Sequence, residues 1–254
     1  MKPGWTDIQR SSRTNVELGM TLAFVAGAIN AGGFLAVGSY TSHMTGVVSS
    51  VADNLVLGHW QLAWIGIACF LAFVAGAMTT AWMVNWSLQR KLRSAYGRPL
   101  VVEAALLLVF GLFGAVIDAH STVLVPITLL VLCYLMGLQN AVVTKISHAE
   151  IRTTHVTGLV TDLGIELGKL VYINGPHMTE GRVVANRRKL GIHLRMITSF
   201  FVGAVCGALG FKYFGFISTV PLAMALMALV WTPLVYDFRQ WQAQSAVDAK
   251  DASR

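Results

Sequence analysis

The sequence predicts an all-α integral membrane protein with six transmembrane helices, arranged as two inverted three-helix repeats, each with an additional short amphipathic motif helix. Three observations predict this class: an apolar composition, an alternating distribution of basic residues, and a polar phrase that occurs twice. Of 254 residues, 55% are hydrophobic and 12% are charged, and the mean hydropathy is +0.62. Soluble domains carry roughly 25% charged residues, so the composition favours a membrane protein.

Six apolar windows are long enough to cross a bilayer, which takes about 20 mostly apolar residues. The windows are 16–39, 61–86, 99–117, 121–144, 194–214 and 217–236. They divide the chain into an N-terminal segment (1–15), a transmembrane domain (16–236) and a C-terminal tail (237–254). Within the domain, repeat one is expected at 16–118 and repeat two at 121–236.

Lysine and arginine alternate between the segments that flank these windows. The N-terminal segment, the second connection, the fourth connection and the tail carry three, four, eight and three of them, whereas the other connections carry none, none and one. Basic residues concentrate on the cytoplasmic side of membrane proteins. We therefore expect a multi-pass protein with both termini in the cytoplasm. The net charge of +7 does not indicate nucleic-acid binding, because the basic residues form short clusters and no continuous basic face.

The three cysteines, Cys69, Cys133 and Cys206, lie inside apolar windows without a CxxC or Cys/His spacing. We expect neither a disulfide framework nor a zinc site. The glycines near the N-terminus lie within an apolar helix and not in a nucleotide-binding loop. The sequence therefore predicts no cofactor, no metal and no enzymatic activity. Lipid-substrate chemistry at His155 and Asp162 is a less favoured alternative.

The polar phrase TSHMTG at residues 41–46 recurs as TTHVTG at residues 153–158. The match extends into the preceding windows, where Gly27 and Asn30 align with Gly137 and Asn140, and into FVAGA (73–77) and FFVGA (200–204). Each half contains three expected spans, which is an odd number. The two halves should therefore cross the membrane in opposite directions, a design typical of secondary transporters whose substrate sites lie at the repeat interface.

Each phrase leads into a segment with helical periodicity. In the second copy, Thr154, Gly158, Asp162 and Glu166 form a polar stripe spaced by four residues; in the first copy, Ser50 and Asn54 occupy the positions of the two carboxylates. Ionisable groups at membrane depth usually face a cavity or a partner. The candidate residues of a substrate or ion pathway are Asn30, Thr41, His43, Thr45, Gly46, Ser50, Asp53, Asn140, Arg152, Thr154, His155, Thr157, Gly158, Asp162 and Glu166.

Simpler interpretations apply to the same residues. A Thr-Gly pair can serve helix packing, and a histidine can pin a helix end by a hydrogen bond. No tight ligand spacing supports a metal site. Glu103, near one end of its window, is expected to snorkel or to pair with Arg98.

The strings GAINAGGFLAVGSYTSHMTGVV and GLQNAVVTKISHAEIRTTHVTGLVTDLG resemble the YoaK-like family of bacterial inner-membrane proteins of unknown function. The resemblance covers about residues 20–236. It implies a multi-helix protein of the bacterial inner membrane and assigns no catalytic or binding residue.

Two functions follow from these patterns. The leading hypothesis is a transporter or permease for a small solute or ion, coupled to protons because His, Asp and Glu exchange them. The alternative is a non-transporting scaffold or regulatory protein whose polar motifs pack helices. The expected partners are the lipid bilayer, an unidentified small solute or ion, and a second copy of the chain; no nucleic acid is expected.

Overall fold

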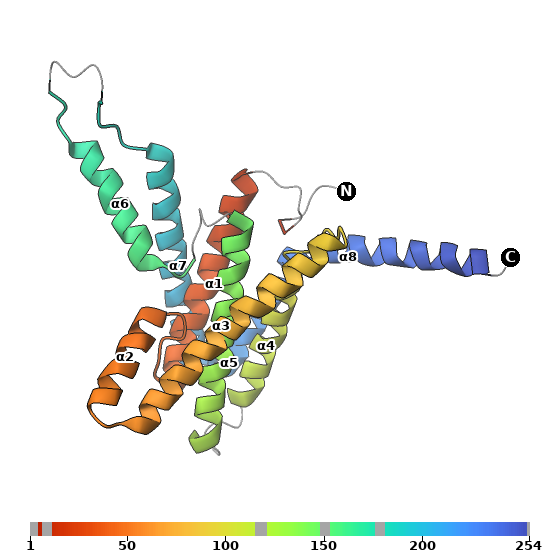
Figure 1. The fold of residues 1–254 in the computed structure, drawn as a ribbon, viewed down its shortest axis with the longest axis horizontal. Coiled ribbons are helices and arrows are strands. Elements are labelled where there is room, and N and C mark those ends of the chain that lie inside the picture. Colours follow the sequence, from red (N-terminus) through yellow and green to blue (C-terminus); the bar gives the residue numbers. More distant parts are fainter. Residues whose placement is uncertain (1–4, 7–11, 115–120, 148–152, 176–180, 253–254) are drawn as a thin grey trace.

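The computed structural model describes residues 5–6, 12–114, 121–147, 153–175 and 181–252. These residues form helices and connections, without a β-strand (Figure 1). The elements are α1 (Ser12–Val37), α2 (Met44–Val56), α3 (Trp60–Gln89), α4 (Arg98–Gly114), α5 (Ser121–Ser147), α6 (Val156–Val171), α7 (Arg187–Phe214), η1 (Gly215–Ser218) and α8 (Thr219–Ala252). The predicted all-α class is confirmed for the described part of the chain.

Each of the six apolar windows corresponds to one helix, and the two motif segments form the short helices α2 and α6. Four helical runs in the described residues are long and apolar enough to cross a membrane: 14–37, 60–89, 124–147 and 187–243, the last of which contains α7, η1 and most of α8. Helix α4 has 17 residues, slightly fewer than the roughly 20 that a span needs. Several helices of this protein can therefore span a membrane.

Helices α7 and α8 extend furthest beyond their windows. Helix α7 begins at Arg187, before the expected residue 194, because Asn186 caps it: its side-chain oxygen accepts a hydrogen bond from the Lys189 N–H at 3.1 Å. Helix α8 continues to Ala252 with Pro233 inside it. Most of the expected C-terminal tail is therefore helical.

The long helices pack in two pairs, α1 on α7 and α3 on α5. Glycines set both contacts. A Cβ atom on Gly27 would collide with the Phe200 carbonyl, and one on Gly137 would collide with the Phe73 carbonyl. Gly27 and Gly137 align in the repeat, and so do Phe200 and Phe73. The contact of Gly27 with Phe200 is therefore equivalent to that of Gly137 with Phe73. Backbones that approach this closely need small residues at the interface.

Glycines on the partner helices, α7 and α3, make equivalent close contacts in the other direction. A Cβ atom on Gly203 of α7 would strike the backbone of Phe24, and one on Gly76 of α3 would strike the backbone of Tyr134. In both pairs, a helix from the first half of the chain packs on a helix from the second half. The halves are interleaved and do not form two separate bundles.

Helix α4 packs mainly on α8 and α5, and its buried face contains Glu103. The expected pairing with Arg98 is wrong: Glu103 is fully buried, neither of its carboxylate oxygens has a hydrogen-bond partner, and the Arg98 Nε donates to Ser94 Oγ at 3.2 Å. The cause is helical phase, because residue 103 lies on the same side of α4 as the buried Leu100 and Leu107.

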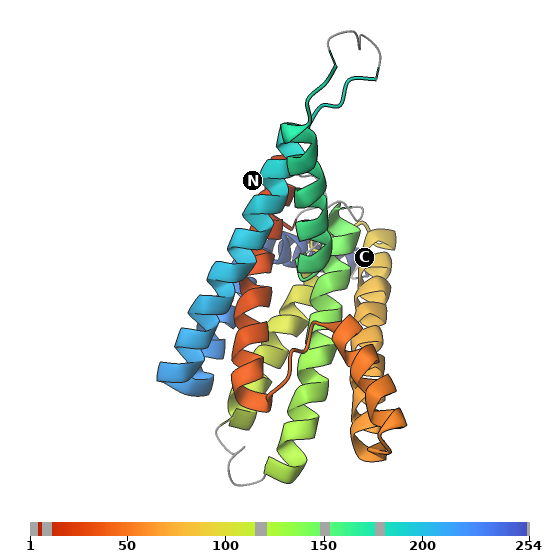
Figure 2. The same ribbon diagram turned by 90° about the vertical axis from the view of Figure 1, so that its left-hand side faces the viewer.

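The two short helices run in opposite directions from the middle of the molecule. Figure 2 shows α2 running toward the end where α3 begins, and α6 toward the end where α3 finishes and α7 begins. The connection after α3, with Arg90, Lys91 and Arg93, and the first turn of α7, with Arg187, Arg188 and Lys189, lie at that second end. Both N-termini, and thus both polar phrases, lie at mid-height of the molecule.

Candidate functional site

The first polar phrase is positioned by a turn at the end of α1. Gly38 has a φ of +71°, a left-handed conformation that ends a helix and favours glycine, and its N–H donates to the Phe34 carbonyl at 2.8 Å. The Tyr40 ring then stacks on Phe34 with centroids 4.6 Å apart. These contacts turn the chain back toward the middle of α1.

Each polar phrase is hydrogen-bonded to an asparagine in the middle of the long helix that precedes it. The Oδ1 atom of Asn30 accepts hydrogen bonds from the Ser42 Oγ at 3.0 Å and the Ser42 N–H at 3.4 Å. In the second half, the Asn140 Oδ1 accepts from the Thr154 Oγ1 at 2.5 Å. Aligned asparagines therefore bind aligned hydroxyls. The pairing explains why the matched asparagines accompany the matched phrases.

His43 and His155 occupy the residues just before α2 and α6, and neither side chain caps its helix. The His43 ring instead folds over the first turn of α2, where a Cβ atom on Gly46 would collide with Nδ1. Glycine at position 46 thus makes room for the imidazole.

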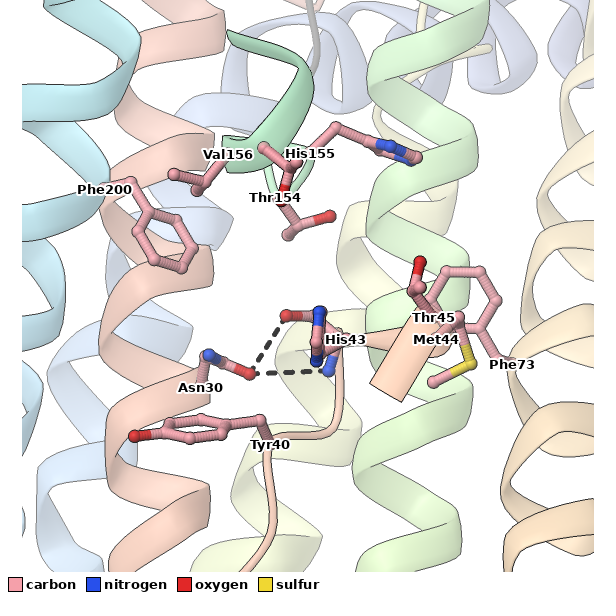
Figure 3. Close-up of a pocket in the computed structure, with 12 residues that line it drawn as sticks. Asn30, Tyr40, His43, Met44, Thr45, Phe73, Thr154, His155, Val156 and Phe200 are labelled. Atoms are coloured by element: carbon pink, nitrogen blue, oxygen red, sulfur yellow. Dashed lines mark hydrogen bonds between the residues drawn. The ribbon is translucent and has the colours of Figure 1, made fainter. Parts of the chain in front are cut away.

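A cavity of about 500 Å³ lies between the two phrases. Figure 3 shows His43 and Thr45 from the first phrase facing it together with Thr154 and His155 from the second, between the rings of Phe73 and Phe200. The lining residues are Asn30, Tyr40, Ser42, His43, Met44, Thr45, Phe73, Thr154, His155, Val156, Thr157 and Phe200. Within the described part of the chain, the lining includes two histidines and no Asp, Glu, Lys or Arg.

Six candidate residues thus line one cavity: Asn30, His43, Thr45, Thr154, His155 and Thr157. Asn140 supports it through Thr154. Thr41 and Thr153 each precede a lining residue in the sequence. Both are fully buried, and their hydroxyls lack hydrogen-bond partners. Gly158 is half-buried on the first turn of α6.

The other candidates lie elsewhere. Gly46 and Ser50 line a second cavity of about 350 Å³ together with Asn54, Cys69 and Cys133. Asp53 is exposed on α2. Asp162 and Glu166 line a third cavity of about 220 Å³ beside Lys189 and His193. Arg152 lies outside the described residues.

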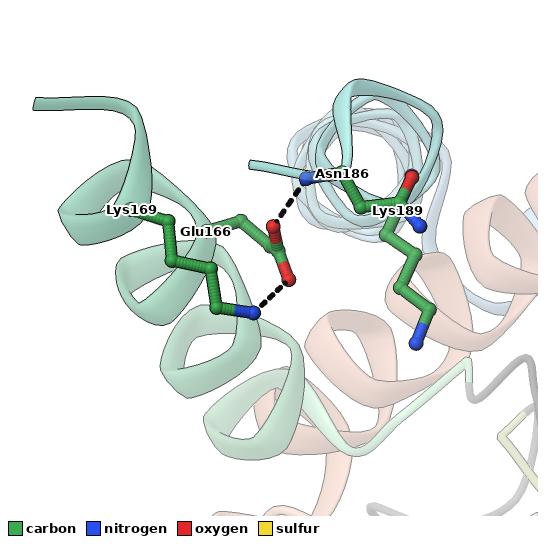
Figure 4. Close-up of polar contacts among 4 residues, drawn as sticks. All are labelled: Glu166, Lys169, Asn186 and Lys189. Atoms are coloured by element: carbon green, nitrogen blue, oxygen red, sulfur yellow. Dashed lines mark hydrogen bonds and ion pairs between the residues drawn. The ribbon is translucent and has the colours of Figure 1, made fainter. Parts of the chain in front are cut away.

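Glu166 joins α6 to the start of α7 (Figure 4). Its carboxylate accepts from the Lys169 Nζ at 2.8 Å and from the Asn186 N–H at 2.6 Å. The Lys169 hydrogen bond lowers the pKa of Glu166, and the Asn186 N–H lowers it further. The carboxylate therefore stays ionised in a structural contact that docks the motif helix on α7.

This contact predicts an acid-sensitive part of the stability. Because the folded pKa of Glu166 is lowered, the ionised carboxylate stabilises the protein above the unfolded value of about 4.3. That contribution is lost as the pH falls through the folded pKa. Glu166→Gln should lower the thermal midpoint in detergent at pH 7, and the deficit should shrink in acid. The control is Asp162→Asn, the same charge change one turn earlier on α6, at an exposed side chain. An equal, pH-independent deficit in both variants would contradict the assigned role.

Sequence reasoning missed the apolar walls of the cavity. Tyr40 precedes the first phrase, Met44 and Val156 lie inside the two phrases, and Phe73 and Phe200 lie on other helices. The alignment of FVAGA with FFVGA contained the signal for the two phenylalanines, since both occupy the same repeat position.

The described residues contain no group of three or more His, Cys, Asp or Glu side chains placed to hold a metal ion. A family model described as a protein of unknown function, DUF1275, matches residues 18–232. No curated protein and no solved structure matches the chain.

Proposed function

The chain belongs to the DUF1275 family of proteins of unknown function, and we propose that it is a membrane permease for a small anion. In this proposal α1, α3, α4, α5, α7 and α8 are six transmembrane helices that form two inverted three-helix repeats. The basic connections lie in the cytoplasm of a bacterial cell, as do both termini. The recurring glycine contacts of α1 with α7 and α3 with α5 support the repeat.

The observation that carries the proposal is the cavity shared by the two phrases. Helices α2 and α6 begin at it and diverge, and Asn30 and Asn140 fix the preceding loops. Secondary transporters with inverted repeats place their substrate between the repeats, near the membrane midplane, with the N-termini of short helices directed at it. A pure packing role for the phrases would not require an open space of about 500 Å³ between them.

The chemistry of the lining favours an anion over a cation. Each helix N-terminus carries roughly half a positive charge, and N–H groups there bind anions readily. Helices α2 and α6 present two such ends to the cavity, and the described residues that line it include no carboxylate. Histidine gains a proton near neutral pH, so protonation of His43 or His155 would strengthen anion binding. We therefore propose that the anion enters together with a proton.

The aromatic walls limit the solute to a small one with an apolar side. Phe73 and Phe200 lie on opposite sides of the cavity, and Tyr40 and Met44 extend the apolar surface. Ligand sites in proteins are commonly apolar with a few placed polar groups. A short carboxylate such as formate or acetate fits this description.

Transport in proteoliposomes tests the proposal. Purified protein would be reconstituted, and uptake would be followed for solutes of three charge classes: formate, acetate and nitrate; urea and glycerol; and methylammonium. We expect uptake of at least one anion at about ten times the protein-free rate or more, since tenfold corresponds to roughly 1.4 kcal/mol. Uptake should be faster when the external solution is more acidic than the lumen. Uptake of only neutral or cationic solutes would contradict the anion, and no uptake in any class would favour the scaffold.

A further inference from the structure

The second half of α8 leaves the helix bundle. Pro233 lies inside the helix, and a proline there removes a backbone hydrogen bond and bends the helix. Figure 1 shows the part after it projecting from the bundle across the direction of α1 and α5. If the long helices cross the membrane, this part of α8 runs along the membrane surface.

The projecting part has an exposed apolar stripe. Phe238 and Trp241 are 57% and 65% exposed, and their rings lie 6.2 Å apart. Leu234, one turn before Phe238, lies on the same side of the helix, but it is half-buried and packs against the core of the bundle. The opposite side carries other exposed residues, Arg239, Gln240 and Ala243. Large apolar side chains that gather on one exposed side of a helix mark a surface for a partner or a membrane.

Two arginines flank, in sequence, the segment 93–94 that contacts the start of the projecting part. The guanidinium groups of Arg90 and Arg98 lie 4.2 and 5.1 Å from the Trp86 ring. Stacking of this kind orients the guanidinium plane, whose five N–H donors suit the oxygens of a phosphate. A positively charged group therefore lies where the projecting part of α8 leaves the bundle.

Asp237 fastens α8 to the segment between these arginines. Its carboxylate is 8% exposed and accepts from the N–H groups of Arg93 and Ser94 at 3.0 and 2.9 Å and from the Ser94 Oγ at 2.6 Å. The Arg93 guanidinium adds a second contact to α8, because it lies 3.9 Å from the Tyr236 ring. The start of the projecting helix is thus held firmly beside Arg90 and Arg98.

We propose that residues 234–243 of α8 form an interfacial helix that binds anionic phospholipid. The exposed rings of Phe238 and Trp241 enter the boundary between headgroups and acyl chains, and Arg90 and Arg98 contact the lipid phosphate. Amphipathic helices bind interfaces through apolar area plus attraction to anionic lipid, and tryptophan is enriched at this depth. The helix fixes how deeply the bundle sits in the bilayer.

Depth-dependent quenching tests the proposal. Full-length protein with Cys206→Ser and Trp241→Cys would carry an environment-sensitive fluorophore at position 241; the remaining cysteines, Cys69 and Cys133, are buried. The matched control would carry the fluorophore at Ala243→Cys, on the opposite side of the helix. In nanodiscs of brominated lipid we expect a blue-shifted emission that loses more than about half its intensity at position 241, where the helix is buried in the interface. Quenching at position 243 should be weak.

Two results would overturn the proposal. One is solvent-like emission at both positions. The other is protection at position 241 that appears only at high protein-to-lipid ratio, since it would assign the stripe to a second copy of the chain.

The lipid charge is tested separately. Replacing part of the phosphatidylcholine with phosphatidylglycerol should deepen the quenching at position 241. The increment should be lost when Arg90 and Arg98 are both changed to Gln. Equal quenching with and without phosphatidylglycerol would contradict the role of the arginines.

Discussion

Replacing Gly137 with alanine is expected to lower the free energy of unfolding by about 3 kcal/mol, at the upper end of the usual cost of overpacking. A Cβ atom at this position would collide with the backbone of Phe73, including its carbonyl. A backbone atom cannot rotate away as a side chain can, so α3 and α5 would have to separate. The same change at Gly27, which contacts Phe200 on α7, should cost a similar amount. Reversible unfolding in mixed micelles measures both.

The matched control for these variants is Gly164→Ala. Gly164 lies in α6, and a Cβ atom there would meet no other atom. Because alanine is the better helix former, this change should stabilise the protein by up to about 1 kcal/mol. A small effect of Gly137→Ala, similar in size and sign to that of Gly164→Ala, would show that the two long-helix pairs do not pack as closely as the structure has them.

Thr157→Trp is expected to reduce anion uptake at least about tenfold, equal to roughly 1.4 kcal/mol. Thr157 is exposed within the first turn of α6 and lines the cavity between the two phrases. An indole at this position would occupy much of a space of about 500 Å³. The helix itself should tolerate the change, so the free energy of unfolding should move by no more than about 0.5 kcal/mol, as for other surface substitutions.

Thr161→Trp is the control for this block of the cavity. Thr161 is exposed one turn further along α6, does not line the cavity, and bonds through its hydroxyl to the Thr157 carbonyl at 2.9 Å. Its variant should keep its uptake within about twofold of the unmodified protein, a difference of less than roughly 0.5 kcal/mol. If both variants transported normally, solute would not pass through this cavity. If both lost transport equally, general damage to α6 would explain the loss.

The sequence predicted the helices well because their signals are local. Long apolar windows identified the long helices, and the spacing by four in TTHVTGLVTDLGIEL identified α6, including the shared face of Asp162 and Glu166, which do line one cavity. The two phrases themselves also meet in space, as the hypothesis of a shared pathway required.

Partners contributed by other helices could not be predicted in the same way. A helical wheel shows that Glu166 lies on a polar stripe, but its partner Asn186 is 20 residues away at the start of α7. Likewise, Glu103 could not be placed from its distance to Arg98, because the rotation of α4 against α8 and α5 decides which side is buried. Helix α6 carries a carboxylate at Glu166 where α2 has Asn54, and this difference thus reflects how α6 docks on α7.

The central claim is that solute passes between the two histidine-bearing phrases, and paired substitutions with equal numbers of changes test it most directly. Anion uptake would be compared between two double variants. The first combines His43→Gln with His155→Gln and alters two cavity residues. The second combines Asp53→Asn with Asp162→Asn and alters two carboxylates outside that cavity. We predict at least about a tenfold loss, roughly 1.4 kcal/mol, in the histidine pair and a change within about twofold in the aspartate pair. Unchanged uptake in the histidine pair together with a loss in the aspartate pair would contradict the account.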